Sequence, residues 1–294
     1  MTTRAALQPL ADWPLAARRG LVGVFTDIDD TLTTEGAITP DALQALHELR
    51  AAGLVAIPIT GRPIGWCTPF LDGDAAQAWP VETMVAENGA VAYVRRPSHP
   101  VTGKNTPQPV WNMRNSLSKI YQQDAGTRAA NSAAMQQVAQ RVLREVPGVG
   151  LSRDSVGRET DLAFDYAEHT SLSPDTVQQV LQVLQDCGMQ TTVSSIHIHG
   201  CFGQFDKWTG AQWIVRTLWG RELASELDRW VFVGDSGNDQ VMFQHFPHSV
   251  GVANIRRFAD RLQHLPRYIT PSERGQGFAE VALAISQARN TQRP

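Results

Sequence analysis

The sequence predicts an α/β fold in which a parallel-sheet core is interrupted by an inserted α+β unit. Short apolar runs that each end in polar residues are typical of strands buried on both faces, as in parallel sheets. Helical stretches separate these runs, and a proline-rich stretch from 95 to 109 interrupts the pattern. We therefore expect a core built from residues 1–95 and 203–294, with an inserted domain at 96–202.

The first part of the chain alternates strands with a helix. The apolar run 21–26 predicts a buried strand, and Thr39 with Pro40 predicts a helix start, with a cap residue followed by proline in the first turn. Two more buried strands are expected at 55–59 and 81–86. The order strand, helix, strand indicates parallel pairing.

The inserted unit and the last part of the chain differ in pattern. The insertion is expected to hold helices at 128–145 and 173–188, a strand at 162–166 and further strand at 189–202. After 203 the α/β pattern returns, with a helix at 206–219, a strand at 230–233, a helix after Asn238, and strands at 249–252 and 268–270.

Composition excludes several classes of protein. Hydrophobic residues make up 42 %, charged residues 19 %, and the net charge is −3, which is typical of a globular protein and argues against nucleic acid as a partner. The three cysteines are an odd number and widely spaced, so neither disulfides nor a zinc site is indicated. No run approaches the roughly 18 apolar residues of a membrane span. We expect a cytoplasmic monomer or homodimer without a membrane partner.

Two acidic clusters follow apolar strands. Asp27, Asp29 and Asp30 come directly after the first strand, and the segment 234–239, Gly-Asp-Ser-Gly-Asn-Asp, follows the strand at 230–233. Ligand sites of α/β sheets lie at the carboxyl ends of the strands. Carboxylate oxygens suit Mg²⁺ and suit zinc poorly. Either cluster alone could instead be a solvated turn, since Asp, Asn, Gly and Ser are common turn residues.

The first cluster resembles the Asp-x-Asp-x-Thr motif of the haloacid dehalogenase-like superfamily of phosphohydrolases. The resemblance implies that Asp27 attacks phosphorus and that Asp29 transfers protons. It assigns Thr60, at the end of the next strand, to a phosphoryl oxygen, and Lys207 to neutralising the phosphoryl charge and the nucleophile. Mg²⁺ is the implied cofactor, held by residues that the resemblance assigns as Asp27, Asp29, Asp235 and Asp239.

The placement of the insertion indicates one branch of this superfamily. Together with Thr60-Gly61-Arg62 and Glu87-Asn88-Gly89-Ala90, an insertion between the second and third motifs is similar to the Cof-type branch, which includes sucrose-phosphate and mannosyl-3-phosphoglycerate phosphatases. The implied architecture is a Rossmann-like core with an α+β cap domain. The residues expected to bind phosphate or substrate are Gly61, Arg62, Asn88, Arg158, Asp161, His197 and Asn238.

The cap residues among these allow two interpretations. Carboxylates suit sugar hydroxyls and arginine suits a second anion, so Arg158, Glu159, Asp161, His197 and His199 are candidates for choosing the leaving group. Alternatively, Arg158 and Glu159 form a solvated pair, and the two histidines merely share one face of a strand. A His-x-His metal site would need a third ligand, and the sequence offers none nearby.

The predicted function is a Mg²⁺-dependent phosphatase that acts through an aspartyl phosphate on a small phosphorylated metabolite, a phosphosugar or phosphoglycosyl acid. A phosphosugar mutase would use the same covalent step, so the motifs leave that alternative open, and a non-catalytic metabolite-binding protein is a third. Cap closure is expected, with hinges near 95–109 and 200–204.

Overall fold

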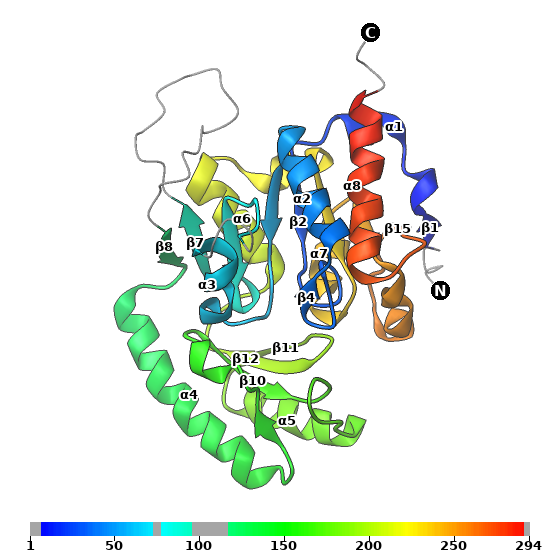
Figure 1. The fold of residues 1–294 in the computed structure, drawn as a ribbon. Helices are drawn as coiled ribbons and strands as arrows, with labels where there is room; N and C mark the ends of the chain where they lie inside the picture. The colour runs from blue at the N-terminus through cyan, green and yellow to red at the C-terminus, as the bar shows by residue number, and fades with distance from the viewer. Residues whose placement is uncertain (1–6, 73–77, 96–116, 291–294) are drawn as a thin grey trace.

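The computed structural model describes residues 7–72, 78–95 and 117–290. These residues form a core with a central sheet and a smaller body on one edge of it (Figure 1). The smaller body holds the elements between residues 125 and 201. Among the described residues, no helix has the length and apolar character needed to cross a membrane.

A six-stranded parallel sheet forms the centre of the core. All its neighbouring strands run parallel, which confirms the predicted α/β class. In spatial order the strands are β1 (Gln8–Pro9), β15 (Tyr268–Ile269), β14 (Ser249–Gly251), β13 (Trp230–Gly234), β2 (Gly23–Thr26) and β5 (Val55–Pro58).

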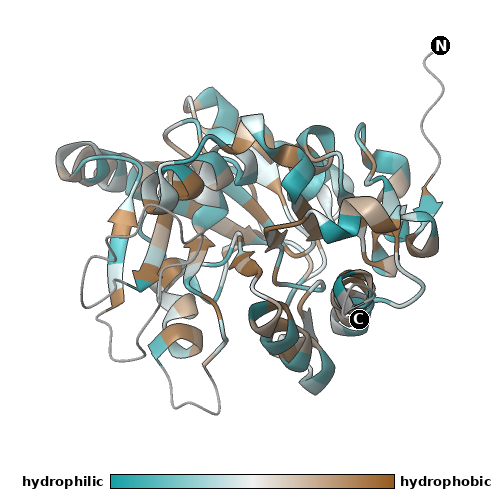
Figure 2. Ribbon diagram, turned by 90° about the horizontal axis from the view of Figure 1, so that it is seen from above, coloured by the Kyte–Doolittle hydropathy of each residue, from teal (hydrophilic) through white to brown (hydrophobic). Residues whose placement is uncertain are grey.

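Helices cover both faces of this sheet, which is why its central strands are apolar on both sides. Within β2, Val24 packs into one apolar cluster and Phe25 into the other. In Figure 2 the helices carry hydrophilic and hydrophobic residues together, as expected for helices that bury one side. The first face holds α1 (Leu15–Arg19), α2 (Pro40–Ala51), α3 (Ile64–Asp72) and α8 (Arg274–Asn290), and the second holds α6 (Lys207–Trp219) and α7 (Gln240–His245).

An antiparallel extension continues the sheet beyond β5. A single parallel bridge between Ile59 and Val85 joins β5 to β6 (Thr83–Ala86). β6 then pairs with β7 (Val91–Arg95), and β7 pairs with β8 (Leu117–Tyr121). Although β8 lies within the range expected for the insertion, it pairs with a strand of the core side.

The inserted body is an antiparallel sheet backed by helices, and we call it the cap. The sheet order is β11 (Gln190–Val193), β12 (His197–Cys201), β10 (Asp161–Asp165) and β9 (Gly150–Leu151). Phe164 and Ile198 pack against α4 (Ala125–Glu145) and α5 (Pro174–Asp186). Because side chains alternate along a strand, the polar residues of β10 and β12 lie on the opposite face, toward the core (Figure 1). They are Asp161, Asp165, His197 and His199.

Short elements complete the chain. The hairpin β3 (Thr33–Thr34) and β4 (Ala37–Ile38) follows the first acidic cluster. The 3₁₀ helices are η1 (Leu10–Asp12), η2 (Glu87–Gly89), η3 (Ser155–Gly157), η4 (Leu223–Ser225), η5 (Leu227–Arg229), η6 (Gly237–Asp239), η7 (Ala253–Arg257) and η8 (Ala259–Arg261).

Most predicted elements are present within a few residues of their expected bounds, but α3, β7, β8 and α8 were not predicted. The proline-rich stretch expected as a linker and hinge, 95–109, lies outside the described residues except for its first position. The other expected hinge includes Gly203, which has a φ of +137°. Gln123 donates to the Phe202 carbonyl at 2.9 Å, so the chain enters and leaves the cap side by side.

Candidate active site

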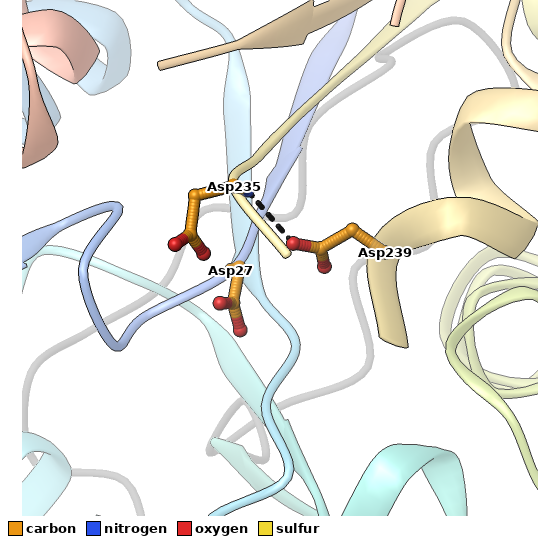
Figure 3. Close-up of side chains that lie close together, drawn as sticks. All are labelled: Asp27, Asp235 and Asp239. Atoms are coloured by element: carbon orange, nitrogen blue, oxygen red, sulfur yellow. Dashed lines mark hydrogen bonds between the residues drawn. The ribbon is translucent and has the colours of Figure 1, made fainter. Parts of the chain in front are cut away.

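Two acidic clusters meet at the carboxyl edge of the central sheet. β2 and β13 are neighbours, and the Asp27 amide donates to the Val233 carbonyl at 2.9 Å, so the chain continues past both strands side by side. Figure 3 shows the side chains of Asp27, Asp235 and Asp239 close together. Carboxylate oxygens of these three buried residues lie within 4.8 Å of one another. The sheet therefore brings together three of the four predicted metal ligands.

Lys207 completes this buried charge cluster. Its Nζ donates to Asp27 Oδ1 at 2.6 Å and to Asp239 Oδ1 at 2.7 Å. Lys207 is the first residue of α6, and its direction is fixed because Asp206 and Thr209 cap that helix reciprocally. Burial by itself would lower the pKa of Lys207, but Asp239 and Asp27 outweigh it and raise that pKa above its ordinary value.

The cluster has the charge and chemistry of a divalent-cation site. When all three carboxylates are ionised, they and the one ammonium leave two negative charges in a buried space. Burial raises the pKa of Asp27 to about 7 against the opposing effect of Lys207. Burial and the neighbouring Asp27 raise the pKa of Asp235 well above its usual range. Hard oxygen ligands with an excess of two negative charges fit Mg²⁺.

Asp235 is oriented by two neutral donors. The Thr31 hydroxyl donates to Asp235 Oδ1 at 3.3 Å, and Asn254 Nδ2 donates to Asp235 Oδ2 at 2.9 Å. Asn254 is buried and also donates to the Asp30 carbonyl at 3.0 Å. This amide therefore ties the two acidic loops together, a role that sequence reasoning missed.

Asp29 lies apart from the three-carboxylate cluster. Its carboxylate accepts from Arg62 Nε at 3.0 Å and from Arg62 Nη2 at 2.9 Å. Arg62 also reaches two carboxylates of the cap, Glu168 at 2.7 Å and Asp154 at 3.2 Å. Arg62 thus links the expected proton-transfer residue of the core to the cap.

The remaining predicted core residues line the loop beyond β5. Thr60 is fully buried, and its Oγ1 accepts from the Arg62 amide at 3.0 Å. Asn238 Nδ2 donates to Asn88 Oδ1 at 3.1 Å, which connects η6 to η2. Thr60, Gly61 and Asn238 face a cavity of about 10 Å³ that Asp27 and Asp29 also line. A space of that size holds about one water molecule, so the cap is closed over the site.

One family of known proteins matches part of this sequence. Residues 24–121 match the family model of a haloacid dehalogenase-like hydrolase. That part of the chain is similar to the haloacid dehalogenase-like hydrolases. The match confirms the predicted family resemblance over these residues and agrees with the predicted hydrolase class. No curated protein sequence is similar enough to this chain to count as a match.

Solved structures share the whole fold of this chain at low sequence identity. A sucrose-phosphatase from Synechocystis sp., in complex with sucrose and phosphate, is 17 % identical with a TM-score of 0.61, covering 91 % of this chain and 98 % of that one. The C-terminal domain of a trehalose-6-phosphate phosphatase from C. albicans is 14 % identical with a TM-score of 0.62, covering 96 % and 99 %. A HAD/COF-like hydrolase from Plasmodium vivax is 14 % identical with a TM-score of 0.61, covering 93 % and 99 %. At these identities the likeness supports the fold, cap included.

The cap residues predicted for substrate are paired with one another and with the core. Arg158 Nη1 donates to the Gly61 carbonyl at 2.8 Å and to Asp161 Oδ1 at 2.9 Å. His197 Nε2 lies 2.9 Å from Glu168 Oε2. Arg158 is buried rather than solvated, and Glu159 pairs with Lys119 instead of with Arg158. The alternative interpretation, in which Arg158 and Glu159 form a solvated pair, is therefore wrong.

Glu87 is a second core residue that holds the cap. It is buried, and its carboxylate accepts from the amides of Ile64 at 3.0 Å and Glu159 at 3.1 Å, and from the amide and hydroxyl of Thr160. Burial, reinforced by nearby Asp161, raises the pKa of Glu87 to about 7. The sequence marked this segment only by its resemblance to a family motif.

Proposed function

We propose that this protein is a Mg²⁺-dependent phosphatase that transfers the phosphoryl group of a small phosphorylated metabolite to Asp27. The observation that carries the proposal is the buried cluster of three carboxylates with Lys207 bonded to two of them. Such a cluster can hold a divalent cation and a phosphoryl group together, because the two charges offset each other. A cation bound there would polarise the phosphoryl group and lower the pKa of the carboxylates around it.

In the first step an Asp27 oxygen bonds to phosphorus while the bond from phosphorus to the leaving oxygen breaks. Lys207, 2.6 Å from Asp27 Oδ1, fixes the nucleophile and offsets the charge that develops. Protonated Asp29 gives its proton to the leaving alcohol. In the second step a water attacks phosphorus and returns a proton to Asp29, which releases phosphate and restores Asp27.

The closed arrangement must open for each turnover. A cavity of about 10 Å³ cannot hold a phosphate ester. In the closed state both carboxylate oxygens of Asp29 accept hydrogen bonds from Arg62, so Asp29 is turned to Arg62 rather than to a leaving group. Since Glu168 and Asp154 belong to the cap, opening removes two partners of Arg62 and frees it to turn toward the substrate. A phosphosugar or phosphoglycosyl acid remains the proposed substrate.

Phosphate release tests the proposal. The panel comprises phosphosugars, phosphoglycosyl acids and p-nitrophenyl phosphate, with Mg²⁺ or with EDTA. The variants are Asp27→Asn and a matched control, Asp30→Asn, which changes the same kind of group three residues along. The Asp30 carboxylate pairs with Arg274 at 3.0 Å, and its φ of 55° suits asparagine.

We expect release that requires Mg²⁺, falls by at least about 1,000-fold in Asp27→Asn and stays within about tenfold of wild type in Asp30→Asn. Equal activity in EDTA would refute the metal requirement. Activity that survives in Asp27→Asn would refute the nucleophile. A requirement for a sugar bisphosphate would favour the mutase.

A further inference from the structure

A pocket of about 780 Å³ lies at the amino edge of the central sheet, opposite the acidic cluster. Val22, just before β2, lines it together with Val55 and Trp230, the first residues of β5 and β13. Asp27 and Asp235 follow the other ends of β2 and β13. At about 3.3 Å per residue these strands place the pocket about 15 Å from the acids, on the side of the core away from the cap (Figure 1). The chemistry proposed above does not use this pocket.

The pocket is positively charged, although the protein has a net charge of −3. Three arginines and one glutamate are the charged residues among the described ones that line it, which gives a charge of +2: Arg221, Arg229, Arg289 and Glu226. Arg289 belongs to α8, and the other three lie between α6 and β13, so the fold brings them together from two parts of the chain. Positive charges that share one hollow favour an anion inside it.

Contacts within the pocket hold the arginines in place. Glu226 forms an ion pair with Arg221, and its Oε2 lies 3.7 Å from Arg229 Nη1. Arg289 donates from Nη1 to the Leu21 carbonyl at 3.2 Å. A guanidinium carries several N–H donors, so each arginine keeps donors for a ligand beyond these contacts with described residues. Groups that are held in position beforehand lose less entropy when a ligand binds.

Two tryptophans give the pocket an apolar wall. Trp219, the last residue of α6, is partly buried, and its ring centroid lies 6.5 Å from that of Trp230. Trp230 is buried, and its indole Nε1 donates to Glu226 Oε1 at 3.3 Å, which fixes the ring. Aromatic rings pack well against one another in offset or edge contacts, so a flat apolar group suits the wall at Trp219.

We propose that this pocket binds a small aromatic anion, with the arginines on its charged group and Trp219 against its ring. The volume of about 780 Å³ lies within the range of about 300–1,000 Å³ that is typical of small-molecule sites. Arginine suits the charged group because its parallel N–H donors match the oxygens of an anion. The inference is independent of the proposed phosphatase activity, since the described lining contains no residue of the acidic cluster.

Three probes separate the contribution of the charge from that of the ring. Naphthalene-2-carboxylate and naphthalene-2-carboxamide have nearly the same shape, but only the first is charged, and acetate carries the charge without the ring. None of them is a phosphate ester, so none can be turned over at Asp27. Isothermal titration calorimetry of the full chain at about 0.15 M salt measures the dissociation constants. We expect naphthalene-2-carboxylate to bind at least about tenfold more tightly than either of the other two probes.

Substitutions locate the bound probe. Arg229→Gln removes one charge from the pocket, and the Arg229 side chain is 48 % exposed, so the fold tolerates the change. Trp219→Leu removes the ring from the apolar wall. Arg216→Gln is the matched control, because Arg216 also pairs with a glutamate, Glu222 at 2.6 Å, but does not line the pocket. We expect Arg229→Gln and Trp219→Leu each to weaken binding of the carboxylate about five- to tenfold, and Arg216→Gln to change it by less than about twofold.

Each outcome supports or overturns the pocket as a binding site. No binding of naphthalene-2-carboxylate below about 1 mM, or equal affinity for the carboxylate and the carboxamide, overturns it. Affinity that is unchanged in both Arg229→Gln and Trp219→Leu, or that is lost in Asp27→Asn, places the probe elsewhere and overturns it as well. Carboxylate binding that Arg229→Gln weakens and Asp27→Asn leaves unchanged supports the site, whether or not the protein hydrolyses phosphate esters.

Discussion

Replacing Lys207 with methionine removes the only positive charge that this buried cluster contains among the described residues. The Lys207 side chain has no exposed surface and bonds to Asp27 and Asp239 at 2.6 and 2.7 Å. Methionine fills a similar volume, so the change deletes charge more than packing. Removing one partner of a buried ion pair costs about 3–5 kcal/mol, because the remaining charge is left uncompensated.

The loss of unfolding free energy in Lys207→Met should be larger at high pH than at low pH. The pKa of Asp27 is already raised to about 7, and loss of Lys207 raises it further. Below that range the carboxylates take up protons and escape repulsion. Lys207→Met should therefore lower the free energy of unfolding by about 3–5 kcal/mol at pH 8 in EDTA, and by less at pH 5.

Urea denaturation followed by tryptophan fluorescence measures this difference. Lys119→Met is the matched control, since Lys119 also pairs with a carboxylate but its side chain is 35 % exposed. A surface pair contributes about 0–1 kcal/mol. If Lys207→Met costs no more than Lys119→Met at pH 8, the assignment of a compensated buried cluster is wrong.

Three further predictions concern pH, metal and positioning. The hydrogen bond from His197, with Arg62, lowers the pKa of Glu168 to about 2, so its stabilising effect is complete above pH 4.5 and is lost as pH falls toward 2. The unfolding free-energy difference between wild type and Glu168→Gln should therefore shrink over that window by up to about 3 kcal/mol, and a constant difference would count against this contact. Because the pKa of Asp27 is raised, the metal-free protein loses stability as the pH rises from 3.8 to about 7. Mg²⁺ should therefore raise Tm more at pH 8 than at pH 6. An equal rise at both pH values would contradict a metal site at Asp27. Asn254→Ala should weaken Mg²⁺ binding about 10- to 100-fold in calorimetry, because Asp235 loses the nearer of the two donors that orient it, and unchanged affinity would refute that role.

The parts of the fold that follow from local patterns were predictable. β2 and β13 are uninterrupted apolar runs, and both faces of the sheet bury them, so composition and position agree. α3 was missed because Pro69 lies inside it and its start has no cap signal. α8 was missed because Gly275 and Gly277 lie in its first turn, where glycine ordinarily argues against a helix.

The site was predictable to a similar extent. Asp27 and Asp235 could be expected to meet, since strand ends in a parallel sheet share one edge. Lys207 was chosen only by its order in the chain, and the structure places it between two of the acids. Glu168 could not be predicted, because its contact with Arg62 depends on how the cap sits on the core. In the sequence, His199 was one of several cap residues that could contact the leaving group. The structure shows that its Nε2 has no hydrogen-bond partner among the described residues.

The central claim is that Asp27 carries the phosphoryl group during turnover. Acid quenching within the first turnover, followed by borohydride reduction and peptide mass spectrometry, tests it directly, because an aspartyl phosphate is reduced to homoserine whereas a free aspartate is not. We predict homoserine at position 27 when substrate and Mg²⁺ are present, and none in EDTA. Turnover that proceeds while position 27 stays aspartate, or modification at a different carboxylate, would contradict the account.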